Sequence, residues 1–138
     1  MRIAAEYADG WNIGFYPSNT PTGFGRKVKA LDRYCKELGR DPKKLRKSWH
    51  GEVVIGETEV DVNEKVALPK KSFSNLDLDY NVARIIGTPD ECFNQIQQYI
   101  NLGASYFMLK FAGAEKIDSL RLFAERVLPH LRQENSGT

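Results

Sequence analysis

The sequence has few of the residues that build disulfide, metal or nucleotide sites. Its two cysteines, Cys35 and Cys92, lie in separate apolar helical patterns without Cys-x-x-Cys spacing, so we expect buried free thiols in a reducing cytoplasm. Metal-ligand spacing, a P-loop and a glycine-rich dinucleotide fingerprint are all absent from the sequence. These absences argue against a disulfide scaffold, a zinc module and a P-loop or Rossmann enzyme.

Long apolar runs and an excess of one charge are also missing. No run approaches the ~20 apolar residues that span a bilayer, and residues 1–7 contain Glu6 and lack the apolar core of a signal peptide. The 20 basic and 18 acidic residues leave a net charge of +2, whereas nucleic-acid-binding domains carry a clear basic excess. We therefore expect a cytoplasmic protein that binds neither a membrane nor nucleic acid.

The size and composition fit one globular domain. The 138 residues are 41% hydrophobic and 28% charged, within the ordinary range for a domain with a real core. We expect a single α/β domain over residues 1–132 and a frayed polar tail over residues 133–138.

The first half of the chain predicts helix, strand, helix. Residues 1–7 have the pattern of a helix end without a preceding cap, which suggests that further chain normally precedes it. Residues 8–16 favour a short buried strand and residues 17–23 favour turns. A helix then follows, closed by Gly39, with a core stripe formed by Val28, Leu31, Cys35 and Leu38. The basic run over residues 40–47 lacks interleaved aromatics and is predicted to be a solvated connection.

The middle of the chain predicts a second strand and a loop. Residues 48–55 form a β-branched strand candidate. Residues 56–59 open a short helix that carries Val62, Val66 and Leu68. Residues 69–81 have no clear period, which is long for a connection and points to a functional or mobile loop.

The last third begins with the strongest local signal. Thr88, Pro89 and Glu91 form a capping box with proline at the first helical position. The helix that follows ends at Gly103. Residues 106–111 are a near-continuous apolar strand, as expected when both faces are covered. A last helix, bent or ended near Pro129, carries a set of apolar residues: Ile117, Leu120, Ala124, Val127, Leu128 and Leu131.

The order of these elements predicts right-handed βαβ units with parallel strands. Three such strands are too few to shield a parallel sheet on both faces and at both edges. The chain therefore has the pattern of part of an α/β fold.

Four segments together resemble the luciferase-like monooxygenase family, whose members use FMN or the deazaflavin coenzyme F420. In chain order they are Ala4-Ala5-Glu6-Tyr7-Ala8-Asp9-Gly10-Trp11-Asn12, Cys35-Lys36-Glu37-Leu38-Gly39-Arg40-Asp41-Pro42, Gly87-Thr88-Pro89-Asp90-Glu91 and Phe123-Ala124-Glu125-Arg126-Val127-Leu128-Pro129. Each lies beside the element that it should flank, and the resemblance covers about residues 2–132. It implies the C-terminal part, about three strand–helix units, of a (β/α)8 TIM-type barrel with parallel strands.

The resemblance also implies an oxidoreductase with its chemistry at the C-terminal mouth of the strands. Trp11 and Asn12, at the end of the first strand, are the candidate cofactor-binding residues. For Trp11 two roles stay open, an aromatic wall beside the cofactor ring and a core tryptophan that closes the barrel end. The family's flavin backstop and phosphate-binding residues have no counterpart here, so the chain is expected to be incomplete for catalysis, and we assign no catalytic residue and no metal ligand.

Lys110 and His50 are the candidate substrate-binding residues. Lys110, at a strand end, is suited to pair with a phosphate or carboxylate, or else it extends its ammonium group to water. His50 is suited to donate a proton or bind an anion, and a structural role is its alternative. His130 is expected on the surface.

A second class of function stays open beside the enzyme. Exposed edges of a parallel sheet bind other chains, so the alternative is a non-catalytic module that associates with itself or with a partner. The partners expected from the two hypotheses are a second copy of the chain, a complementary N-terminal barrel portion and a small-molecule substrate.

Overall fold

The structure is a computed structural model that describes residues 1–14, 18–67, 83–112 and 117–135. Its described residues group into two compact units, the first from residues 1–51 with 98–109 and the second from residues 52–97 with 110–138. The loop predicted over residues 69–81, Leu68 and the strand end at residues 15–16 lie outside the described residues. The single domain expected over residues 1–132 stays a prediction.

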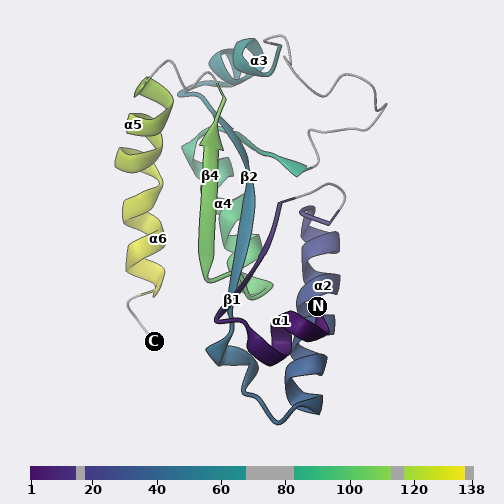
Figure 1. Ribbon diagram of the computed structural model, residues 1–138. Coiled ribbons are helices and arrows are strands. Elements are labelled where there is room, and N and C mark those ends of the chain that lie inside the picture. Colours follow the sequence, from purple (N-terminus) through teal and green to yellow (C-terminus); the bar gives the residue numbers. More distant parts are fainter. Residues whose placement is uncertain (15–17, 68–82, 113–116, 136–138) are drawn as a thin grey trace. The chain divides into compact units, whose positions relative to one another are not determined.

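Helices and strands alternate through much of the chain (Figure 1). The helices are α1 (Arg2–Tyr7), α2 (Pro21–Glu37), α3 (Glu59–Ala67), α4 (Pro89–Asn101), α5 (Ile117–Arg126) and α6 (Leu128–Asn135), with a 3-10 turn at Pro42–Lys44. The strands are β1 (Gly10–Ile13), β2 (Arg46–Ile55), β3 (Ile85–Gly87) and β4 (Tyr106–Phe111). Every helix and strand predicted from the sequence is present, β4 with the predicted bounds.

The strands form a sheet in which β2 pairs with the other three. β1 runs parallel to the first part of β2, with Gly10 opposite Arg46 and Ile13 opposite Trp49. β3 runs parallel to the last part of β2, with Ile85 opposite Val53. Ser105 N–H donates to the Lys47 carbonyl and Ala112 N–H to the Val53 carbonyl, one at each end of β4. Residue numbers therefore increase in the same direction along β4 and β2, and the two strands are parallel. The predicted parallel α/β fold is confirmed.

The core of the first unit contains an aromatic cluster around Trp49. Trp49 is fully buried, and its ring lies 4.9 Å from the Tyr99 ring and 6.3 Å from the Phe107 ring, between centroids. Its indole Nε1 and the Tyr99 hydroxyl both donate to the backbone carbonyl of Asn19, at 2.7 and 2.8 Å. These two bonds fix the segment before α2 against β2 and the last turn of α4.

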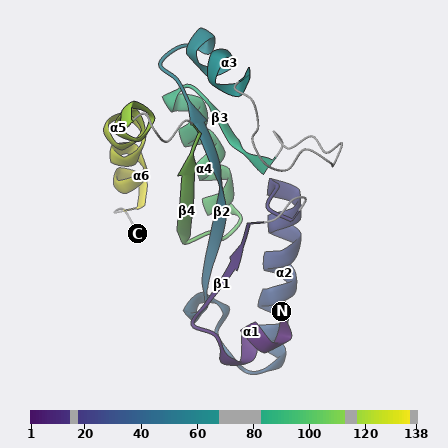
Figure 2. The same cartoon turned by 45° about the horizontal axis from the view of Figure 1, so that its top comes forward.

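α1 packs beside the C-terminal half of α2, as Figures 1 and 2 both show. Their shared core consists of Ala5, Leu31, Cys35 and Leu45, all buried. Arg40 closes the end of α1, because its guanidinium donates to the Ala5 carbonyl at 2.9 Å and to the Ala8 carbonyl at 2.6 Å. The unpaired carbonyls at the end of a helix need such partners.

α2 starts earlier than the sequence pattern suggested. Residues 17–23 were predicted as turns, but Pro21–Gly23 form the first turn of the helix. Thr20 caps it, its side-chain oxygen accepting from Gly23 N–H at 3.1 Å, and Pro21 occupies the first helical position. A threonine cap followed by proline is a helix start signal, which the other turn-forming residues of the segment hid. Gly39 ends the helix with φ +70, as predicted.

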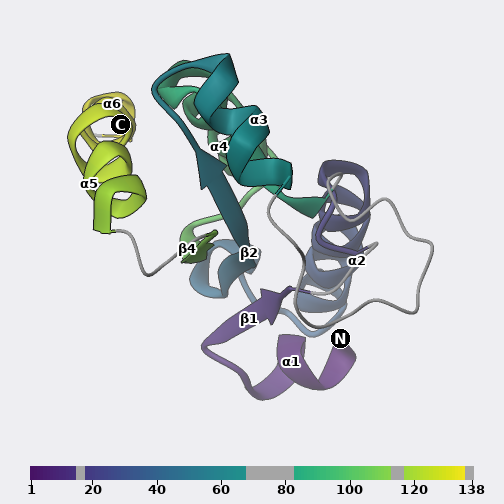
Figure 3. The same ribbon diagram turned by 90° about the horizontal axis from the view of Figure 1, so that it is seen from above.

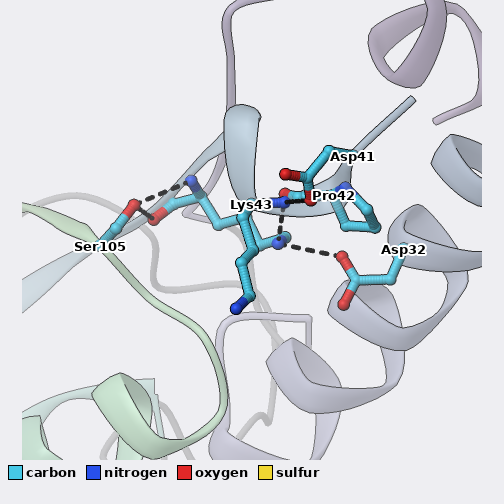
Figure 4. A network of polar contacts seen from close by, with 6 residues as sticks. Asp32, Asp41, Pro42, Lys43 and Ser105 are labelled. Atoms are coloured by element: carbon cyan, nitrogen blue, oxygen red, sulfur yellow. Dashed lines mark hydrogen bonds and ion pairs between the residues drawn. The ribbon is translucent and has the colours of Figure 1, made fainter.

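The basic run over residues 40–47 is not simply a solvated connection. Besides Arg40, Lys47 has only 9% of its side chain exposed, and its ammonium lies 2.9 Å from an Asp32 carboxylate oxygen and donates to the Pro42 carbonyl at 3.0 Å. Its backbone N–H donates to the Ser105 hydroxyl at 3.2 Å. Figure 4 shows Asp32, Pro42 and Ser105 around this network. A buried ammonium requires such pairing, so these two basic residues have structural roles.

The second unit holds a strand that the sequence analysis missed. β3 has three residues, Ile85–Gly87, and directly precedes the α4 cap. The Gln95 side chain bonds the Ile86 backbone in both directions, at 3.1 and 2.7 Å. The predicted capping contact is present, since Thr88 N–H donates to the Glu91 carboxylate at 2.8 Å.

The C-terminal helices differ from expectation in the face that they bury. α5 and α6 follow one another along nearly one axis (Figure 3), with a break next to Pro129 as predicted. The apolar residues Ile117 and Leu120 are exposed at 65% and 51%, whereas Ser119 and Phe123 are buried. The Phe123 ring packs edge-on against Phe111 of β4. Of the predicted apolar set, Val127 is fully buried, so the helices bury part of that set together with Phe123.

β4 is covered on one face only, contrary to the prediction of two covered faces. Tyr106 and Met108 are 50% and 38% exposed, and the Lys110 side chain is 74% exposed. Their neighbours Phe107 and Phe111 pack against rings of the core. Both cysteines are buried and unpaired, which confirms the free thiols.

Candidate functional site

The ring contacts of the first unit separate the two faces of its strands. Trp11 of β1 packs on Phe24 of α2, with centroids 6.1 Å apart, and Trp49 of β2 packs on Tyr99 of α4 and Phe107 of β4. Successive strand residues point to opposite faces. Odd-numbered residues of these strands therefore face the helices, and even-numbered residues form the opposite face, which we call the even face.

The even face of the first unit is polar on two strands. It carries Asn12 on β1, Ser48 and His50 on β2, and Tyr106 and Met108 on β4. Ser48 is buried at 7% exposure, while Asn12 and His50 are exposed. In a β/α barrel the helices cover the outside of the strands. Since helices cover the odd face here, the even face corresponds to the barrel interior.

Asn12 and Ser48 are paired directly across the two strands. They are register partners, and the Ser48 hydroxyl lies 2.9 Å from Asn12 Oδ1 and 3.2 Å from the Trp11 carbonyl. A hydroxyl has a single proton to donate, and the shorter contact is to Asn12. Because Asn12 Oδ1 accepts that proton, the Asn12 amide is oriented with its NH₂ group pointing away from Ser48. Asn12 can therefore donate to an oxygen atom of a ligand.

The second unit has its own polar cluster, formed by Glu52 of β2, Lys110 of β4 and Arg84, which directly precedes β3. The Arg84 guanidinium is 2.7 Å from one Glu52 carboxylate oxygen, and the Lys110 ammonium is 4.0 Å from the other. Arg84 is nearly buried, with 5% of its side chain exposed, and Glu52 has 18% exposed. Lys110 is the exposed member of this cluster, with 74% of its side chain open to solvent.

The structure treats the four predicted site residues differently. It brings Asn12 beside Ser48, places His50 on the same face, and pairs Lys110 with Glu52. It packs Trp11 between β1 and α2, on the odd face. Ser48, Glu52 and Arg84 were missed by the sequence analysis. The alternation of Ser48, His50 and Glu52 along β2 is a signal that could have found two of them.

Two buried groups on α4, the Cys92 thiol and the Tyr99 hydroxyl, have raised pKa values. Burial raises the pKa of Cys92 to about 12, and burial also raises the pKa of Tyr99. Neither group is suited to proton transfer near neutral pH. Among the residues that the structure describes, no group of histidine, cysteine and acidic side chains is arranged to hold a metal ion, and no helix has the length and hydrophobicity to cross a membrane.

Comparison with known proteins identifies the fold. No family model and no curated protein sequence matches the chain. Solved structures match it over nearly its whole length. The coenzyme F420-dependent tetrahydromethanopterin reductase of Methanopyrus kandleri matches with a TM-score of 0.67 and 18% identity, over 94% of this chain and 47% of that one. The EDTA monooxygenase of Chelativorans sp. BNC1 matches with a TM-score of 0.69 and 16% identity, over 97% and 44%.

A riboflavin lyase, solved with modified FMN and its substrate riboflavin, has a TM-score of 0.70 and 17% identity, over 97% of this chain and 40% of that one. The chain thus spans less than half the length of each of these three structures. These matches confirm the predicted fold, part of a (β/α)8 TIM-type barrel with parallel strands.

Proposed function

We propose that the chain is the C-terminal portion of a luciferase-like oxidoreductase that uses FMN or F420, with the even face of its strands directed to cofactor and substrate. The observation that carries this proposal is the polarity of that face. The interior of such a barrel is ordinarily filled by bulky apolar side chains. Asn12, Ser48 and His50 stand where those would lie, and polar groups are costly there unless they have partners.

In this proposal the residues of the chain bind and orient, and the cofactor supplies the redox chemistry when bound. Asn12 donates from its NH₂ group to a ring carbonyl, because Ser48 holds its Oδ1. Trp11 supports Asn12 from the odd face by fixing β1 on α2. Lys110, in the second unit, is suited to bind an anionic group of a substrate. His50, in the first unit, is suited to donate a hydrogen bond or a proton to a substrate.

Titration of the purified chain with FMN and with F420, followed by cofactor absorbance and fluorescence, tests the proposal. Asn12→Ala should weaken binding by roughly tenfold, the equivalent of one hydrogen bond of about 1.4 kcal/mol. Asn94→Ala, an exposed site on α4, is the matched control and should leave binding unchanged. Absence of binding to either cofactor, alone or with a complementary N-terminal barrel portion, would overturn the proposal.

The two substrate-binding residues have matched controls as well. His50→Ala is compared with His130→Ala, since these are the only histidines in the chain. His130 lies exposed against the Phe93 ring. Lys110→Gln is compared with Lys29→Gln, an exposed lysine of α2. Only the first variant of each pair should weaken binding of an anionic substrate.

The partner proposed for the complete site is the remainder of the barrel, supplied by a complementary portion. Among the described strands, β1 and β4 each pair only with β2, so each has one unpaired edge. The exposed Tyr106 and Met108 on β4 favour an apolar partner surface. The same features support the second hypothesis, self-association without catalysis. Light scattering during size-exclusion chromatography tests it, and a monomer at all concentrations would count against it.

A further inference from the structure

His50 lies against Gly14 at the end of β1. β1 ends at Ile13, the register partner of Trp49, and Gly14 follows directly, beside His50 of β2. A Cβ atom on Gly14 would lie 2.6 Å from His50 Nδ1, 2.9 Å from its Cβ and 3.0 Å from its Cγ. Carbon atoms do not approach nitrogen or carbon so closely without a shift. The imidazole therefore occupies the space that any other side chain at position 14 would need.

The requirement for glycine at this position comes from His50 and not from the backbone. Gly14 does not have the left-handed φ that favours glycine, unlike Gly39 and Gly103. Gly10, four residues earlier at the start of β1, shows the contrast. A Cβ there would meet Arg46 at 3.5 Å, which is ordinary van der Waals contact. Of these two glycines, only Gly14 has the position of its missing Cβ occupied by a neighbouring side chain, that of His50.

We propose that Gly14 is a positioning residue for His50. Because Gly14 has no side chain, the Nδ1 edge of the His50 imidazole lies against the backbone there, and Nε2 is the nitrogen presented to the ligand. The inference rests on the proposed function, in which His50 binds substrate. Nδ1 and Nε2 lie at separate corners of the ring, so when Nδ1 lies next to Gly14, Nε2 is directed away from the strand. The ligand group that this arrangement suits is an oxygen acceptor such as a carboxylate or phosphate.

Nuclear magnetic resonance of the free chain tests the arrangement directly. The imidazole protons of His50 should show nuclear Overhauser contacts to the Gly14 α protons. The second histidine, His130, serves as an internal reference. Absence of these contacts in the wild-type chain would overturn the proposal without any variant having to fold.

Two alanine variants and one probe complete the test. Gly14→Ala should move the His50 ring resonances and leave those of His130 in place, whereas Gly10→Ala should move neither. Equal shifts in both variants, or none at His50, would contradict the proposal. When inorganic phosphate is added to the wild-type chain, the His50 Nε2 signal should shift more than Nδ1, and the reverse order would contradict the proposal. If the Overhauser contacts are present but FMN and F420 both fail to bind, the proposed function falls and the placement of His50 stands.

Discussion

Trp49 and Asn19 are joined by a hydrogen bond of 2.7 Å from the indole Nε1 to the backbone carbonyl. The same carbonyl accepts a second bond from the Tyr99 hydroxyl at 2.8 Å. Two buried donors thus converge on one acceptor of a connecting segment. This arrangement fixes the start of α2 relative to β2, the strand that carries His50.

The two donors should differ in what they contribute to stability. Tyr99→Phe keeps the ring and leaves the carbonyl one partner, so we expect a loss of about 1 kcal/mol in the free energy of unfolding. Trp49→Phe removes the donor and also part of a fully buried ring, so we expect a loss of about 3 kcal/mol. Urea denaturation of both variants measures the difference. Equal losses would contradict a packing role for Trp49.

The buried Arg84–Glu52 pair should matter far more than an exposed pair. Glu52→Gln removes the negative charge that lies 2.7 Å from the nearly buried Arg84 guanidinium, and breaking such a pair costs about 3 kcal/mol. Glu37→Gln is the matched control, because Glu37 pairs with Arg33 at 3.6 Å with both side chains largely exposed, and such pairs contribute at most ~0.5 kcal/mol. Chemical denaturation of both variants makes the comparison. Similar losses in the free energy of unfolding would show that the Glu52 carboxylate does not stabilise the core more than an exposed pair does.

Cys92 should be unreactive in the folded chain. Burial raises the pKa of its thiol from 9.0 to about 12, so the reactive thiolate is scarce at neutral pH. In a Cys35→Ala variant, a disulfide-exchange reagent at pH 8 should label Cys92 only after unfolding. Because the folded pKa is raised, the stability linked to this thiol is fully present below pH 9 and is lost as the pH rises toward about 12. Rapid labelling of the native variant would contradict this.

The cap of α4 should weaken in acid. The hydrogen bond from Thr88 N–H lowers the pKa of Glu91 below its usual 4.5. A carboxyl group with a depressed folded pKa contributes stability above its unfolded pKa, and loses it as the pH falls through the folded value. Below pH 5, the melting temperature of the wild type should therefore fall more steeply with decreasing pH than that of Glu91→Gln. Identical pH profiles would show that the carboxylate has no part in the cap.

Local patterns were enough to predict most of the fold. The α4 cap and the Gly39 helix end follow from capping and dihedral rules, and β4 follows from a continuous apolar run, all of which act over a few residues. β3 was missed because three residues give no period, and its pairing with β2 is a long-range contact. The roles of Arg40 and Lys47 were missed because a charge run does not reveal which side chains reach a carbonyl or carboxylate.

The candidate site was predictable only in part. Asn12, His50 and Lys110 were found as polar residues on strands, but strand position alone does not tell which face meets the helices. That assignment needed the ring contacts of Trp11 and Trp49. The partners Ser48, Glu52 and Arg84 depend on strand register, which is set by tertiary packing.

The central claim is that the even face of the strands meets the cofactor. Nuclear magnetic resonance of the chain during titration with FMN and with F420 tests it most directly. The account predicts the largest shifts at the Asn12 side-chain amide and the His50 ring, with the indole N–H of the buried Trp49 nearly unmoved. Shifts confined to the odd face, or no shift with either cofactor, would contradict it.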